Sequence, residues 1–205
     1  MIQDIYPHKL NNQYHPDQKP DADSIILYFT QEGLLHRLLK KEDLEEMGQE
    51  DLFSLDEMIY TGDGKKLARP TLLNEEHLFL SFPRLSDFVN DTHVTEETLT
   101  YLFSVDDDNY FLLNEAPEEI PEDYEFNTVR ELRNLQIGPK YRTFAAITGL
   151  HLYNWYRTNR FCGCCGQPMI HDKGERSFFH RTCFKMPILR SLNLSKNRAC
   201  CDRWC

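Results

Sequence analysis

The chain has 205 residues, which is enough for one medium-sized domain and a small additional module. Hydrophobic residues make up 40% of it, including 13 Phe and 10 Tyr, so it can bury a substantial core, and this composition excludes a disordered chain. No apolar stretch approaches the ~18 residues of a membrane span. The first residues lack the basic and apolar regions of a signal peptide, so we expect no membrane association and a location in the reducing cytoplasm.

Charge is divided unevenly along the chain. Residues 1–150 carry 13 Lys and Arg against 30 Asp and Glu, a balance of −17, whereas residues 151–205 carry 10 against 3, a balance of +7. The acidic main body argues against non-specific binding of nucleic acid. The basic C-terminal part could bind a phosphate or RNA, although solvated surface charges are the simpler interpretation.

The first half of the chain begins with a polar stretch of about 22 residues, punctuated by prolines, which we expect to be extended. The apolar run Ser24–Phe29 contains β-branched residues and predicts a buried strand. A second strand is expected over residues 32–39, with the turn at Gly33. Residues 40–52 have the composition of a helix.

Strand and turn signals continue through the middle of the chain. The glycines within residues 60–68 indicate a turn, and His77–Phe82 reads as a strand. The clearest hairpin joins Thr98–Val105 to Tyr110–Leu113 through an Asp- and Asn-rich turn. Residues 115–125 follow as an acidic loop containing prolines.

A helix is predicted over Pro139–Arg160. Proline suits the first turn of a helix, and the arginines near the end suit the negative end of the helix dipole. Apolar and small residues recur at steps of three, four and three, which predicts one buried face made of Ala145, Thr148, Leu152 and Trp155. This helix leads directly into a cluster of cysteines.

Four cysteines, Cys162, Cys164, Cys165 and Cys183, follow 161 residues that contain none. Cys162 and Cys165 form a C-x-x-C pair in a glycine-rich turn, whose backbone N–H groups can face the sulfur atoms. His180 and Cys183 form an H-x-x-C pair after 14 intervening residues. Two such pairs supply the tetrahedral Cys₃His set of a structural zinc ion, a site that contributes folding energy and no chemistry. Cys164 is interpreted as a bystander.

Two other interpretations of this cluster stay open. Cys162 and Cys165 could be a thioredoxin-like redox pair, although no βαβ pattern surrounds them. Alternatively, His180 could be an ordinary surface residue, which would leave a degraded site with three cysteines.

The residues around the cysteines resemble a known family. The stretch HLYNWYRTNRFCGCCGQPM (residues 151–169) is similar to the junction in NADH pyrophosphatases of the Nudix superfamily, where a helix enters a zinc ribbon. IQDIYPH (2–8), LFSVDDDNYFLL (102–113) and FNTVRELRNL (126–135) also resemble the N-terminal domain of that family. In the family the second ligand pair is normally Cys-x-x-Cys, and here its first position is occupied by His180.

The resemblance implies a reaction whose catalytic motif this sequence lacks. Family members split NAD(H) into NMN(H) and AMP, with Mg²⁺ or Mn²⁺ held by glutamates of a Nudix box, G-x5-E-x7-R-E-U-x-E-E-x-G-U, where U is aliphatic. Glu122, Arg130 and Glu131 match part of this box, but Asn134 and Leu135 stand where the metal-binding glutamates belong. We reject that match. We therefore expect no catalytic residues here and no activity of the chain alone.

The resemblance also implies the organisation of the chain. We expect an α+β fold: a mixed or antiparallel sheet with flanking helices over residues 1–140, a connecting helix over 141–160, and a small zinc ribbon over 161–186. Residues 187–205 do not resemble the family, and we expect an aberrant, disordered tail. Codons for this tail can be read in other frames as family-like sequence, so truncation by frameshift is one hypothesis. The tail contains Cys200, Cys201 and Cys205.

Three functions follow from these observations. The first is a catalytically inactive NADH pyrophosphatase-like module with a structural role in a homodimer, as the N-terminal domain and ribbon have in the family. The second is a stand-alone zinc-ribbon module that binds a nucleotide, RNA or a protein partner through Arg157, Arg160, Arg176 and Arg181. The third is a redox or metal sensor built on Cys162, Cys165 and the cysteines of the tail. The first explains both the resemblance and the abrupt tail.

Overall fold

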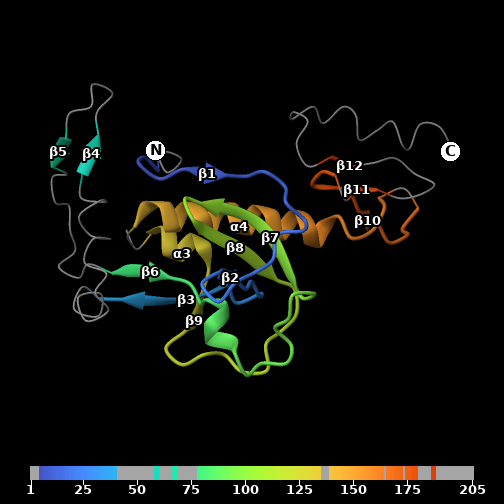
Figure 1. The fold of residues 1–205 in the computed structure, drawn as a ribbon, viewed down its shortest axis with the longest axis horizontal. Coiled ribbons are helices and arrows are strands. Elements are labelled where there is room, and N and C mark those ends of the chain that lie inside the picture. The colour runs from blue at the N-terminus through green and yellow to red at the C-terminus, as the bar shows by residue number, and fades with distance from the viewer. Residues whose placement is uncertain are drawn as a thin grey trace.

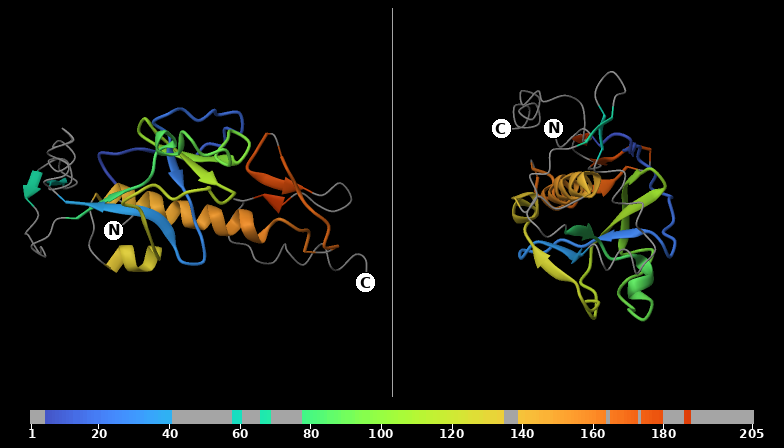
Figure 2. Two further views of the ribbon diagram at one scale, coloured as in Figure 1. Left: turned by 90° about the horizontal axis from the view of Figure 1, so that it is seen from below. Right: turned by 90° about the vertical axis from the view of Figure 1, so that its left-hand side faces the viewer.

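The computed structural model describes residues 5–40, 58–60, 66–68, 78–134, 139–163, 165–172, 174–179 and 186–187. These residues form the expected α+β fold, with a four-stranded mixed sheet, antiparallel sheets and two α-helices (Figure 1). The long helix runs across the mixed sheet, and the C-terminal hairpins lie at its far end (Figures 1 and 2). Within the described part of the chain, no helix combines the length and apolar character that crossing a bilayer requires.

The mixed sheet has the strand order β1-β7-β8-β2. Its centre is the predicted hairpin, β7 (Leu99–Val105) and β8 (Asp108–Leu113), which pair antiparallel. The predicted strand at Ser24–Phe29 is confirmed as β2 (Ile25–Leu27), which lies parallel to β8. β1 (Leu10–Asn11) pairs with β7 inside the polar stretch that was expected to be only extended.

A second, antiparallel sheet has the order β6-β3-β9. Two of its strands confirm predictions: β3 (Leu34–Leu39) and β6 (Phe79–Ser81). The third, β9 (Glu125–Asn127), was not predicted and begins at the end of the acidic loop. Gly33 makes the turn before β3 with φ of +140°, a conformation that favours glycine.

Shorter elements complete the described part of the chain. β4 (Met58–Tyr60) and β5 (Lys66–Ala68) pair antiparallel on either side of the turn predicted within residues 60–68. Residues 61–65 of that turn, and residues 41–52 of the predicted helix, lie outside the described residues. A 3₁₀ helix, η1 (Leu85–Phe88), and a short helix, α3 (Val129–Asn134), were not predicted.

The long helix α4 (Lys140–Thr158) confirms the prediction, with Pro139 at its N-cap. Its buried face is rotated slightly from the predicted one. Ala145 and Leu152 are buried as expected, whereas Thr148 and Trp155 are only partly buried. The buried residues of α4 are Tyr141, Thr143, Ala145, Ala146, Gly149, Leu152 and Tyr156.

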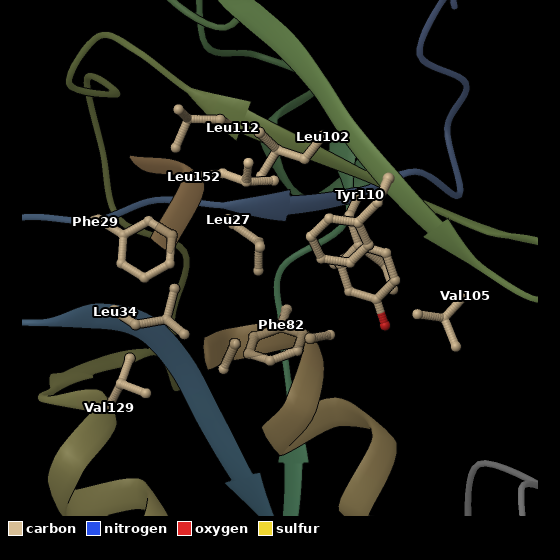
Figure 3. Packing of buried hydrophobic residues seen from close by; sticks show 14 of the residues in the cluster. Leu27, Phe29, Leu34, Phe82, Leu102, Val105, Tyr110, Leu112, Val129 and Leu152 are labelled. Atoms are coloured by element: carbon tan, nitrogen blue, oxygen red, sulfur yellow. The ribbon is translucent and has the colours of Figure 1, made fainter. Parts of the chain in front are cut away.

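Successive side chains of each strand point to opposite faces of the mixed sheet, and a separate hydrophobic cluster covers each face. On one face, Leu27, Tyr110 and Leu112 pack with residues of α4 such as Leu152 (Figure 3). On the other face, a second cluster includes Phe111 with residues of η1 and the following loop. The sheet therefore fixes the position of α4, and α4 carries the chain to the cysteines.

Candidate metal centre in the C-terminal hairpins

The predicted C-x-x-C pair lies in a tight turn that begins three residues after α4. Phe161 and Pro168 form an antiparallel β-bridge that closes this turn. Within it, the Cys162 N–H donates to the Gln167 carbonyl over 2.8 Å, and the Gly166 N–H donates to the Cys162 carbonyl over 2.8 Å. Cys162 is buried and Cys165 is exposed. The turn therefore holds both predicted ligands within one short loop.

Gly166 is required by the backbone of this turn. Its φ of +68° lies in the left-handed region, where a side chain is disfavoured. A Cβ atom at this position would meet no atom within 4 Å, so the constraint is conformational and not steric. The second glycine of the CGCCG motif thus has a structural reason that is independent of any metal.

The second predicted pair belongs to a three-stranded antiparallel sheet made of β10 (Ile170–His171), β11 (Ser177–Phe179) and β12 (Met186–Pro187). In the sequence, His180 directly follows β11, and Cys183 stands between β11 and β12. Both residues lie outside the described ones, as do Cys164, Cys200, Cys201 and Cys205. β12 extends one residue past the predicted end of the ribbon. Of the four predicted ligands, the structure therefore describes Cys162 and Cys165.

The strands β10, β11 and β12, which belong to the predicted ribbon, pack on the last turns of α4 through aromatic rings. The Trp155 and Phe178 rings are stacked with centroids 4.8 Å apart, and the Tyr156 and His171 rings are stacked at 5.2 Å. His171 and Phe178 also contact each other, with centroids 4.0 Å apart. Trp155 therefore packs on Phe178 of β11 and is partly buried.

Arg176 anchors the ribbon to the main domain. Its guanidinium donates hydrogen bonds to Asn12 Oδ1, over 2.8 Å, and to the carbonyl of Leu102. The register of β7 and β8 shifts between Tyr101 and Phe103, so Leu102 lies at an irregularity of the ladder. Arg176 is only 9% exposed, and burial lowers the pKa of its guanidinium.

This burial corrects the set of arginines predicted to form a binding surface. Arg176 faces the domain and cannot be one of the surface contacts. Arg157 and Arg160 are exposed near the end of α4, and Arg181 lies outside the described residues. The guanidinium of Arg157 lies over the Tyr153 ring, 5.7 Å from its centroid.

A second group of possible metal ligands was missed in the sequence because Glu118 is distant in the chain from Asp91 and His93. Single ligand atoms of Asp91, His93 and Glu118 all lie within 4.8 Å of one another. Asp91 already accepts backbone N–H groups from both His93 and Glu118, and Glu118 pairs with Thr92. These side chains hold two surface loops together, which accounts for their proximity without a metal.

The rejected Nudix-like match also has a structural explanation. Glu131 lies in the first turn of α3, where its carboxylate accepts hydrogen bonds from the Thr128 N–H over 2.9 Å and the Thr128 hydroxyl over 2.7 Å. The Thr128 hydroxyl in turn accepts the Glu131 N–H over 3.3 Å. These hydrogen bonds, the one from the hydroxyl above all, lower the pKa of Glu131. The pair is a reciprocal helix cap.

Comparison of the chain with protein-family models, curated proteins and solved structures found no match in any of the three.

Proposed function

We propose that this chain is a structural module of the NADH pyrophosphatase type, in which an α+β domain carries a zinc ribbon and has no catalytic activity of its own. The observation that supports this most is the turn of Cys162 and Cys165. It follows directly on a long helix packed against the sheet, in the order that the resemblance implies. The backbone of the turn, with left-handed Gly166, also suits a C-x-x-C-G metal-binding loop.

The proposed ligands are Cys162, Cys165, His180 and Cys183, around one structural Zn²⁺ ion. Thiolates and imidazole are the donors that zinc prefers, and the first pair lies in one loop. Zinc would tie this loop to the chain segment between β11 and β12, and its binding energy would add to the folding energy of the ribbon. Thiolate ligands require reduced cysteines, which supports a cytoplasmic location.

The proposed role is to support a dimer and to frame a catalytic site that this sequence does not carry. Phe161 and Ile170 are 61% and 46% exposed on the ribbon, which supports a contact with another polypeptide. NAD(H) and the catalytic Mg²⁺ or Mn²⁺ belong to the full-length family, through its Nudix domain. For this structural role we propose neither a membrane nor a nucleic acid as a partner.

The experiment combines metal analysis with an activity assay on the full chain purified without chelators. We expect about one zinc per chain, lost in Cys162→Ser and kept in the matched control Cys164→Ser. We expect no release of AMP from NADH in the presence of Mg²⁺. A chain without zinc, or equal loss in the two variants, would contradict the metal site, whereas AMP release would contradict the structural role alone.

The stand-alone binding module is the alternative, and the exposure of Arg157 and Arg160 at the end of α4 favours it. It predicts salt-dependent binding of a nucleotide, RNA or an acidic protein, weakened by Arg157→Gln and Arg160→Gln together. If titrations at low salt show no binding of any of these ligands, this alternative is refuted.

A further inference from the structure

The segment that follows β1, residues 12–20, forms an N-terminal strap without regular secondary structure. In Figure 1 it runs between β7 and the C-terminal hairpins. Within the described part of the chain, the one backbone–backbone hydrogen bond of the strap joins the Gln18 N–H to the His15 carbonyl, which is in the strap itself. No strand pairing therefore fixes the strap on the sheet, and its position depends on side-chain contacts.

Two side chains of the strap contact the turn between β10 and β11. The guanidinium of Arg176 donates to Asn12 Oδ1 over 2.8 Å, and its Cζ lies 5.7 Å from the centroid of the Tyr14 ring. The Tyr14 hydroxyl donates to the Asp172 carbonyl over 3.2 Å. Arg176 also donates to the carbonyl of Leu102 in β7 and is only 9% exposed. One buried side chain thus joins the ribbon, the strap and the sheet.

The turn that makes these contacts is held together by its own hydrogen bonds. The Asp172 N–H donates to the Ser177 carbonyl over 2.9 Å. The Asp172 carboxylate accepts the Gly174 N–H over 2.7 Å and the Glu175 N–H over 3.3 Å. These bonds position the Asp172 carbonyl and Arg176 together, so both contacts with the strap require a folded hairpin of β10 and β11.

The contacts between the strap and the main domain are weaker. Lys19 pairs with Glu96 over 3.2 Å, but their side chains are 77% and 62% exposed, and such surface ion pairs contribute little stability. The His15 and Tyr101 rings are tilted, with centroids 6.1 Å apart. Among the described residues, the ribbon therefore supplies the stronger hold on the strap.

A groove of about 420 Å³ lies between the strap and the mixed sheet. Strap residues line it together with Tyr101 and Phe111 of the sheet and His171 of β10. Tyr101 and Phe111 are only 5% and 1% exposed, so this sheet face is covered while the strap is in place. Displacement of the strap would widen the groove and uncover these rings.

We propose that the ribbon controls the strap: the docked ribbon holds the strap closed over the sheet, and an undocked ribbon releases it and opens the groove. The contacts of Arg176 and Tyr14 carry this inference, and they include none of the proposed zinc ligands. In the function proposed above, zinc maintains the ribbon, so loss of zinc is the event that releases the strap. That trigger rests on the proposed function, whereas the hold on the strap does not.

The first test is the rate at which chymotrypsin cleaves the full chain after Tyr14, followed by the mass of the fragment 1–14. Cleavage of a native chain requires local opening, and its rate follows the population of the open form. Arg176→Gln leaves the strap sequence unchanged and should raise this rate at least about tenfold, as expected for loss of a hydrogen bond to a charged group. Arg157→Gln removes an exposed guanidinium and is the matched control, with a change of less than about twofold.

The second test measures the same coupling from the other side, because coupling between two sites is reciprocal. Asn12→Ala removes the acceptor of Arg176 and should raise hydrogen exchange of the β10 and β11 amides at least about tenfold. Gln13→Ala, at the next and equally exposed position, should change it less than about twofold. Circular dichroism checks the fold of each variant, and Asn12→Ala carries the test if Arg176→Gln does not fold.

The proposal is overturned if folded Arg176→Gln is cleaved no faster than Arg157→Gln, or if Asn12→Ala exchanges like Gln13→Ala. Chelation of the wild-type chain should raise cleavage after Tyr14 as Arg176→Gln does. A zinc-loaded chain whose cleavage does not rise on chelation overturns the metal-controlled release. A chain that binds no zinc contradicts the function proposed above, and the two variants then decide whether the ribbon holds the strap.

Discussion

Gly33→Ala tests whether the turn into β3 is fixed by the backbone geometry of the structure. A Cβ atom at this position would lie closer than 3.0 Å to the Asn127 carbonyl, and 2.8 Å from the Thr128 nitrogen. The obstacle is the backbone of β9, which cannot move without disturbing its pairing with β3. The native φ of +140° is also one that alanine rarely adopts.

The expected cost combines these two effects. A strained backbone conformation costs about 1–3 kcal/mol, and forcing a packed element to shift costs about 1–3 kcal/mol more. We therefore expect Gly33→Ala to lower the free energy of unfolding by about 3 kcal/mol or more, a large fraction of the ~5–15 kcal/mol typical of a domain.

Two other glycines provide graded controls. Gly166 has a φ of +68° but open space around it, so Gly166→Ala should cost about 1–2 kcal/mol from the left-handed conformation alone. A Cβ atom on Gly163 would meet no atom within 4 Å, and its φ is not in the left-handed range, so Gly163→Ala should be nearly neutral. Urea denaturation followed by circular dichroism measures all three. A Gly33→Ala variant within about 0.5 kcal/mol of wild type, the range of ordinary surface substitutions, would refute the reasoning.

Two further predictions concern pH, and a third concerns the metal. Burial lowers the pKa of His171 below its ordinary 6.5, so the folded chain binds fewer protons than the unfolded chain. The free energy of unfolding should therefore fall as the pH is lowered through 6.5. His171→Phe should reduce the change in the thermal midpoint between pH 7.5 and pH 5.5. Burial raises the pKa of Asp108 above 3.8, although the charges of Arg142 and Arg84 oppose this shift. The protonated carboxyl group therefore contributes its full stabilisation below pH 3.8, and this contribution is lost as the pH rises through the pKa of the folded state. Asp108→Asn should accordingly raise the melting midpoint at pH 7 and give no gain near pH 3; an equal gain at both would count against this reasoning. Removal of zinc by a chelator should lower the protection of ribbon amides from hydrogen exchange more than that of β7 and β8 amides, and uniform loss would contradict a local metal site.

The elements that the sequence predicted best are those whose patterns are local and long. The hairpin of β7 and β8 has two apolar runs around a polar turn, and α4 has a proline start and a helical period. The short elements were missed for the opposite reason. β1, with two residues, and β9, with three, exist because distant strands pair with them, and neither carries a periodic pattern of its own.

The role of Arg176 could not have been predicted from its neighbours in sequence. It stands in a polar turn of the ribbon, where an arginine normally faces water. Its burial depends on an irregularity in β7 that exposes the Leu102 carbonyl, and on Asn12 from the opposite end of the chain. The spacing of the cysteines, in contrast, indicates a metal site from the sequence alone. The structure adds the loop geometry of Cys162 and Cys165.

X-ray absorption spectroscopy at the zinc edge, on the purified full chain, tests the central claim most directly. The proposed ligand set predicts a four-coordinate zinc with three sulfur neighbours at about 2.3 Å and one nitrogen at about 2.0 Å. His180→Cys should convert this to four sulfur neighbours without loss of metal. A wild-type site with four sulfurs, with fewer than three, or with no zinc at all would contradict the Cys162, Cys165, His180 and Cys183 centre.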